Sequence, residues 1–166
     1  MASIKKSMNT ESGGRRNGEV ARYLKRIHSY LLIAGYDERH AAPYGRLAMV
    51  IESHPEDIET LAKERRLKRI SRLGWKIEKT IRDYLATGSS ERFELISRVA
   101  PPSVLELLDI PGIGVNTTRS FFLNFGISSR EELKLALDDG WLQALGIYRA
   151  SVLSDVHQYL RQAEAR

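Results

Sequence analysis

The chain has 166 residues, of which 42% are apolar, 28% are charged and none is cysteine, a balance typical of a soluble globular protein with its own core. The absence of cysteine excludes a disulfide scaffold, a thiolate metal site and a cysteine nucleophile, and it fits a reducing compartment. No run of residues approaches the ~18 apolar positions that span a bilayer, and residues 1–14 lack the apolar core of a signal peptide. We therefore expect a cytoplasmic protein without a membrane partner.

The net charge of +5 is unevenly distributed along the chain. Residues 61–82 hold nine Lys and Arg residues against two Glu residues. A concentrated basic block of this kind indicates either a binding surface for a polyanion or a solvated helix face. Charge alone favours neither interpretation.

Apolar residues at helical spacing predict an all-α protein, because they recur three and four residues apart in successive short segments and no strand pattern is convincing. Residues 1–16 are small and polar, and we expect a disordered tail there. We expect two small helical subdomains, residues 17–100 and 101–166, divided at Pro101-Pro102. The predicted helices begin near residues 17, 41, 55, 74, 90, 104, 115, 129 and 149.

The most specific local motif is Ile110-Pro-Gly-Ile-Gly114, between an apolar helix and a second helix that begins at Val115. Pro111 stops the first helix, and glycine at 112 and 114 permits positive φ and leaves backbone N–H groups uncovered. Unpaired N–H groups at a helix N-terminus bind anions such as phosphate. The alternative is an ordinary tight turn between packed helices. The candidate DNA contacts here are Gly112, Ile113, Gly114, Asn116, Thr117 and Arg119.

Two segments resemble degenerate copies of this turn. Residues 70–74 keep the final Leu-Gly but lack the proline and the first glycine, and residues 145–148 are shorter by one residue. Because residues 70–74 lie inside the basic block, we expect side chains to hold phosphate where the backbone turn has been lost. Trp75 either stacks on an exposed base or sugar or packs under the turn. The candidate contacts of this segment are Arg69, Arg72, Gly74, Trp75, Lys76 and Lys79.

The order of these segments resembles the N-terminal region of family X DNA polymerases, the polymerase beta group with its bacterial members. The resemblance covers about residues 17–160. It rests on the stretches 17–21, Pro43-Tyr44, 50–52, 55–59, Gly74, Lys76-Ile77, 84–88, Pro101-Pro102, 105–108, 110–114, 125–127 and 131–133.

The resemblance implies a lyase-type helical domain with one helix-hairpin-helix, followed by a second such subdomain. It implies binding to gapped, nicked or duplex DNA in repair, by backbone contacts with little sequence preference. It also implies pocket contacts from Tyr44 and from His40, with Arg46 retained nearby, and a monovalent cation (K⁺ or Na⁺) at turn carbonyls of residues 110–115. No other cofactor is expected, and a separate repair enzyme is a candidate partner.

The departures from the family concern catalysis. The chain offers no Gly-Ser motif with a downstream Asp-x-Asp pair, so we expect no polymerase activity. The lysine that forms the family's Schiff base corresponds to Thr80, whose hydroxyl cannot form an imine. A lyase would then have to use Lys76 or Lys79, so we expect DNA binding without catalysis. Lyase activity and a derived protein-interaction module remain the alternatives. The four histidines lack metal-ligand spacing, and no resident metal is expected.

Overall fold

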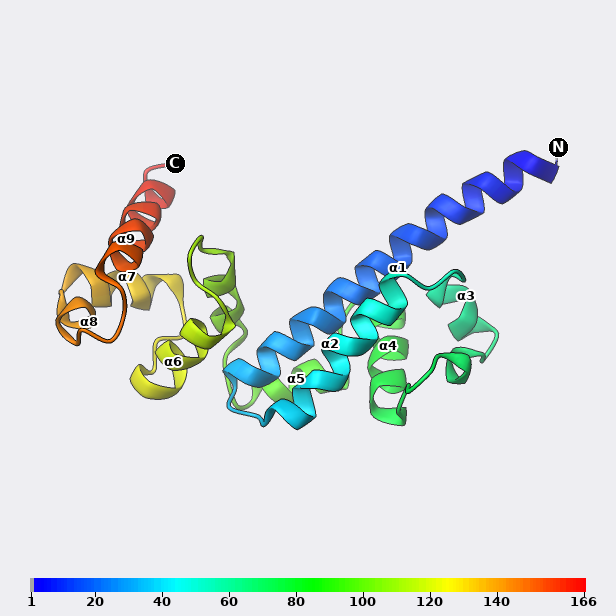
Figure 1. Ribbon diagram of the computed structural model, residues 1–166, viewed down its shortest axis with the longest axis horizontal. Helices are drawn as coiled ribbons and strands as arrows, with labels where there is room; N and C mark the ends of the chain where they lie inside the picture. Colours follow the sequence, from blue (N-terminus) through cyan, green and yellow to red (C-terminus); the bar gives the residue numbers. More distant parts are fainter. Residues whose placement is uncertain (1) are drawn as a thin grey trace. The chain divides into compact units, whose positions relative to one another are not determined.

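The structure is a computed structural model that describes the backbone of residues 2–166 and the side chains of residues 16–166. Its described residues form helices and no strand, which confirms the all-α class (Figure 1). The disordered tail expected for residues 1–16 lies almost wholly outside the residues whose side chains are described. The elements are α1 (Ala2–Ile33), α2 (Glu38–Glu52), α3 (Ile58–Lys63), η1 (Leu67–Arg69), α4 (Trp75–Thr87), α5 (Glu91–Ser97), η2 (Pro102–Asp109), α6 (Val115–Phe125), α7 (Arg130–Asp138), α8 (Trp141–Ala144) and α9 (Ala150–Glu164), where η marks a 3₁₀ helix.

The chain divides into two compact units. Unit 1 comprises Met1–Leu31 and Asp37–Ile96, and unit 2 comprises Leu32–Tyr36 and Ser97–Arg166. The division after residue 96 lies a few residues before Pro101-Pro102, and unit 2 also includes the loop that follows α1.

The core of unit 1 is built on one face of α1. Val20, Leu24, Ile27 and Leu31 recur at helical spacing and are fully buried, which is the pattern of a helix that packs on one side. Aromatic pairs extend this core to later helices, since the Tyr23 ring stacks on Tyr84 of α4 with 4.1 Å between centroids. On the exposed side, Lys25 Nζ lies 2.9 Å from a Glu52 carboxylate oxygen and so links α1 to α2.

Asn17 connects α1 to α3 through three hydrogen bonds. Its amide donates to the backbone carbonyls of His54 and Glu56 at 3.2 and 3.0 Å, and its side-chain oxygen accepts from the Ile58 N–H at 2.7 Å. Asn17 is only 2% exposed, so these bonds satisfy polar groups that water does not reach.

Unit 2 has its own apolar core, which holds the two sides of the hairpin at residues 107–121 together. Leu107 of η2, Phe121 of α6 and Leu133 of α7 meet Val156 of α9 there. The Ser129 hydroxyl accepts a hydrogen bond from the Glu132 N–H at 3.1 Å and so caps α7, which begins where the sequence predicts a helix start. The Trp141 ring contacts Phe125 but remains 39% exposed, so it lies at the edge of this core.

Candidate nucleic-acid interface

The turn at residues 110–114, here called hairpin 2, has the geometry expected from its sequence. Gly112 has φ +88°, which glycine adopts without a steric penalty. The Ile113 N–H donates to the Ile110 carbonyl at 3.1 Å, and Ile113 itself is 6% exposed. The side chain of Ile113 therefore belongs to the core, and only its backbone is available to a ligand.

Hairpin 2 presents bare N–H groups at the start of α6. The first α6 hydrogen bond runs from the Thr118 N–H to the Gly114 carbonyl at 3.0 Å, and no side chain caps the helix. Within the described part of the chain, the N–H groups of Gly114, Val115, Asn116 and Thr117 have no acceptor. These donors and the positive end of the helix dipole suit an anion.

The turn at residues 70–74, here called hairpin 1, repeats this geometry. The Leu73 N–H donates to the Ile70 carbonyl at 3.3 Å, and the first α4 bond runs from the Glu78 N–H to the Gly74 carbonyl at 3.0 Å. Gly74 has extended backbone angles and provides no side-chain cap. The expectation that this backbone turn had been lost is therefore wrong.

Arg72 replaces the first glycine of the motif in hairpin 1. It corresponds to Gly112 and adopts φ +63°. A left-handed conformation costs a non-glycine residue about 1–2 kcal/mol. The turn is thus retained at the expense of local backbone strain, and an exposed guanidinium stands where hairpin 2 has no side chain.

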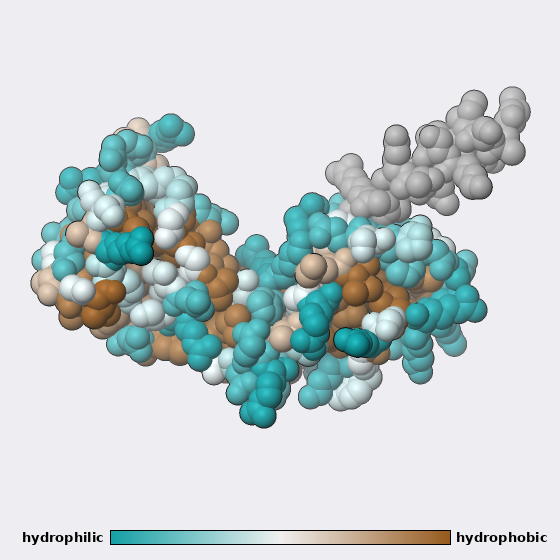
Figure 2. Space-filling view, viewed as in Figure 1, coloured by the Kyte–Doolittle hydropathy of each residue, from teal (hydrophilic) through white to brown (hydrophobic). Residues whose placement is uncertain are grey.

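The third predicted turn, residues 145–148, has a different structure. Gly146 has φ +67°, and its N–H donates to the Gln143 carbonyl at 3.2 Å at the end of α8. Leu145 and Ile147 are 44% and 60% exposed. The surface of this turn is therefore apolar instead of basic. Both units show such apolar areas on a mostly hydrophilic face (Figure 2).

Ion pairs divide the nine cations of residues 61–82 into two groups. Four have carboxylate partners: Lys63 lies 3.4 Å from Glu59, Arg66 lies 2.9 Å from Glu56, Lys79 lies 2.9 Å from Asp83, and Arg82 lies 3.0 Å from Glu78. The other five are exposed and have no carboxylate within 4.0 Å among the described residues. We call these five the basic patch: Arg65, Lys68, Arg69, Arg72 and Lys76.

Arg46 of α2 adds a sixth cation beside the basic patch. It lines a cavity of about 150 Å³ together with Pro43 and Arg72. No acidic residue lines this cavity, and Arg46 has no carboxylate partner in the described part of the chain. Two guanidinium groups around one acid-free cavity favour an anionic ligand.

The two pocket residues implied by the family resemblance lie apart from this cavity wall. His40 is exposed on α2, and Tyr44 is 3% exposed, with a hydroxyl group that has no hydrogen-bond partner among the described residues. The Tyr44 ring lies 6.0 Å from the Arg92 guanidinium. Neither residue lines the cavity that Arg46 and Arg72 share.

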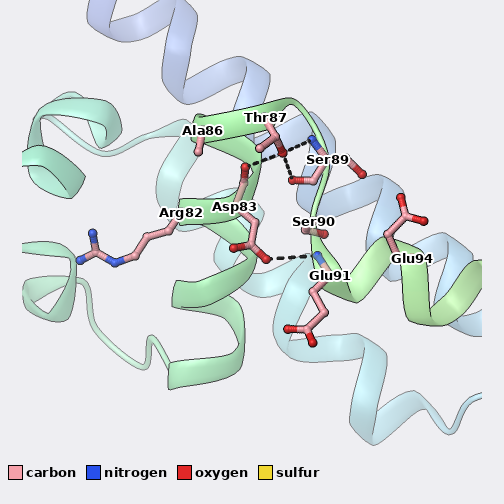
Figure 3. Close-up of a pocket in the computed structure, with 8 residues that line it drawn as sticks. All are labelled: Arg82, Asp83, Ala86, Thr87, Ser89, Ser90, Glu91 and Glu94. Atoms are coloured by element: carbon pink, nitrogen blue, oxygen red, sulfur yellow. Dashed lines mark hydrogen bonds between the residues drawn. The ribbon is translucent and has the colours of Figure 1, made fainter.

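Lys79 belongs to an acidic surface instead of the basic patch. Its ammonium lies 2.9 Å from Asp83 and 3.0 Å from Glu91, and hydrogen bonds to these two carboxylates raise the pKa of Lys79. Burial raises the pKa of Asp83, but hydrogen bonds from Lys79 and from the Glu91 N–H outweigh it and lower the pKa. Both carboxylates line an open depression with Glu94 (Figure 3). Phosphate binding by Lys79 would require these ion pairs to break.

Thr80 offers no chemistry at the position of the family's nucleophile. It is 2% exposed, and its hydroxyl donates to the Lys76 carbonyl at 2.9 Å. The amine of Lys79 is held protonated by its carboxylates, whereas an imine-forming amine must be neutral. The geometry of these two residues disfavours Schiff-base chemistry.

Trp75 does not pack under the turn of hairpin 1. The ring is 72% exposed, and the Lys76 ammonium lies over it at 5.6 Å from the centroid. Of the two interpretations of Trp75, packing under the turn is therefore wrong, while stacking on a base stays a prediction.

At hairpin 2, Asn116 is exposed, whereas Thr117 and Arg119 are half-buried. Arg119 has no carboxylate partner in the described part of the chain. The monovalent cation at residues 110–115 stays a prediction. Within the described residues, no group of three or more His, Asp or Glu side chains is arranged to hold a metal ion.

The comparisons with known proteins identify no family. A scan against protein-family models finds none that matches the chain, and a search of curated proteins finds no match. Of the described helices, none combines the length and the apolar character that crossing a membrane requires.

Proposed function

We propose that the chain binds DNA through its phosphate backbone, with little sequence preference, by means of hairpins 1 and 2. The observation that carries this proposal is the basic patch, whose five exposed cations have no carboxylate partner among the described residues. Cations left unpaired on a protein surface repel one another unless a polyanion neutralises them, and DNA releases counterions when it does so.

Hairpin 2 supports the proposal by a different kind of contact. Its bare N–H groups lie at the start of an 11-residue helix, where they fit a phosphate oxygen and make no contact that depends on base identity. Apart from its chain neighbours, Gly114 has no atom of the described residues within 4 Å of the position of a Cβ, and it has an ordinary φ. Neither packing nor strain therefore explains glycine there, whereas the proposed close approach of a strand does.

Binding without catalysis is the form of the proposal that these residues favour. Thr80 is buried and Lys79 is ion-paired, so of the two lysines that the lyase alternative names, Lys76 is the one without a carboxylate partner among the described residues. Borohydride trapping on an abasic duplex tests it directly, because a Schiff base would leave a covalent adduct.

Fluorescence anisotropy on a labelled duplex, measured over a series of salt concentrations, tests DNA binding. With about five phosphate contacts, log K falls with log[salt] at a slope of about −4 to −5. Intact, nicked and gapped duplexes with a 5′-phosphate are compared at the same salt, because the cavity shared by Arg46 and Arg72 suits a terminal phosphate. Absence of binding at low salt, or a slope near zero, contradicts the proposal.

Docking of a separate repair enzyme is a second candidate function, favoured by the third turn. Leu145 and Ile147 expose apolar side chains there, and exposed apolar clusters are typical of protein interfaces. In a pull-down, the Gly112→Ala and Gly114→Ala double variant should keep such a partner, and Ile147→Ser should lose it. Retention of the partner by Ile147→Ser would exclude this turn.

A further inference from the structure

Trp75 is the most exposed large apolar side chain of the described residues, at 72% exposure. It is the first residue of α4 and follows Gly74 directly. No other aromatic ring pairs with it among the described residues, and the ring lies outside the core of unit 1. Packing within the described protein therefore does not explain a tryptophan at this position.

The surroundings of the Trp75 ring are those of a strand-binding surface. Two members of the basic patch flank it in sequence: Arg72 lies three residues before it, and Lys76 follows it and places its ammonium over the ring. An ammonium lies over only one face of a ring, so the high exposure leaves the opposite face open. An open aromatic face among cations that hold phosphates is the arrangement on which unpaired bases stack.

Hairpin 2 provides an internal comparison. The two turns share their hydrogen bonds and extended second glycine, but the position of Trp75 is occupied by Val115, which is half-buried. Phosphate binding by the hairpin geometry therefore does not need an aromatic ring. Both hairpins can bind phosphate through backbone N–H groups. The Trp75 ring of hairpin 1 is therefore best explained by a contact with another part of the ligand.

We propose that Trp75 stacks on an unpaired base, so that hairpin 1 prefers DNA with a single-stranded segment next to a duplex over a flush duplex. This inference rests on the proposed DNA binding. It adds a preference for DNA with an unpaired segment. The basic patch alone would bind a flush duplex and a duplex with an unpaired segment equally well. Bases in an intact duplex are stacked on one another and leave no face for Trp75.

The test measures anisotropy with two probes, a blunt duplex and the same duplex with a single-stranded overhang of about four nucleotides. Trp75→Ala removes the ring and keeps the backbone N–H. It should lower affinity for the overhang by about 5- to 150-fold, and affinity for the blunt duplex by less than about twofold. Trp75→Phe should retain most of the preference, and Trp75→Val should lose it. Because the ring is exposed, these variants should melt like the parent chain.

Intrinsic fluorescence gives a second readout. Trp141 is the only other tryptophan, so Trp141→Phe leaves Trp75 as the sole reporter. The overhang should quench its emission and the blunt duplex should not.

The outcomes separate the two proposals. Failure of the parent chain to bind either probe refutes the proposed DNA binding. Two results overturn stacking on an unpaired base but leave DNA binding intact, provided that the parent chain binds in a salt-dependent way. Trp75→Ala either loses the same affinity for both probes or loses no affinity for the overhang probe.

Discussion

Replacement of Arg72 by glycine should make the protein more stable and bind DNA more weakly. Arg72 has φ +63°, a conformation that costs a side-chain-bearing residue about 1–2 kcal/mol. Glycine removes this cost but adds about 0.5–1 kcal/mol of conformational entropy in the unfolded chain. The net gain is about 1 kcal/mol, which raises the melting temperature by about 3 °C for a chain of this size.

The expected loss of DNA affinity comes from the charge. Arg72 is exposed, has no carboxylate partner among the described residues and shares a cavity with Arg46. Loss of one phosphate contact makes the slope of log K against log[salt] shallower by about 0.9, and it lowers affinity about eightfold at 0.1 M salt relative to a 1 M reference. Anisotropy over a salt series measures both quantities, and calorimetry on the same samples measures stability.

Arg72→Ala is the matched control, because it removes the charge but keeps a Cβ in the left-handed conformation. It should lose as much affinity as Arg72→Gly and gain no stability. If Arg72→Gly is more stable but binds DNA with unchanged affinity and slope, Arg72 does not contact the polyanion. If it is less stable, the arginine side chain supports the fold and the strain argument is refuted.

Four further predictions concern residues placed by the structure. Gly74→Ala should lower duplex affinity in anisotropy yet change stability by less than about 1 kcal/mol, since among the described residues no atom beyond its chain neighbours lies within 4 Å of the added Cβ. Lys76→Ala should lower affinity about eightfold at 0.1 M salt, whereas Lys79→Ala should change it by less than about twofold in the same assay because Lys79 is ion-paired. Asn17→Ala should lower the urea-measured free energy of unfolding by about 2–4 kcal/mol, because it leaves the Ile58 N–H and two carbonyls without a partner. Asp138→Asn should melt below the parent at pH 7, and most of the difference should be lost as pH falls from about 4 to about 2.

The pH range for Asp138 follows from the shift of its pKa. Hydrogen bonds from Lys134 and then His157 lower the pKa of Asp138 from 3.8 to about 2. A carboxyl group with a lowered folded-state pKa stabilises the fold above its unfolded pKa, and it loses that contribution as pH falls through the folded value. A difference between parent and Asp138→Asn that is as large at pH 2 as at pH 7 would show that the effect is not electrostatic.

The helices could be predicted because their local rules agree with their packing. The apolar spacing of α1 coincides with its buried face, and Ser129 caps α7 as its spacing to Glu132 indicates. Asn17 shows what spacing cannot give, since its three partners lie 37 to 41 residues further along the chain. The sequence predicts a helix start near residue 17, which is wrong, because α1 begins at Ala2 and Asn17 lies inside it. The link from Asn17 to α3 becomes visible only when the chain is folded.

The cations of residues 61–82 show a similar limit. Composition counts nine positive side chains as one block, but whether a cation is available depends on carboxylates brought to it by the fold. Glu91, which is 12 residues from Lys79, removes that lysine from the surface that DNA would contact. Arg65 and Lys68 lie beyond the motif and were missed as candidates, although the pattern of ion pairs among the described residues leaves both of them available. Spacing alone could have divided part of the block, because three of its four ion pairs join residues four apart on one helix: Lys63 with Glu59, Lys79 with Asp83 and Arg82 with Glu78.

Hairpin 1 explains why a motif search underestimates this site. A search requires glycine where φ is positive, and Arg72 fails that requirement while adopting the conformation. The strain of about 1–2 kcal/mol is small beside the stability that a core provides. The fold therefore tolerates an arginine at this position, and the arginine places a positive charge at the tip of the turn. A residue that is unfavourable for the backbone and left without an ion-pair partner is more easily explained by a ligand than by folding. The substitution that makes hairpin 1 look degenerate is therefore the observation that most favours its use as a binding surface.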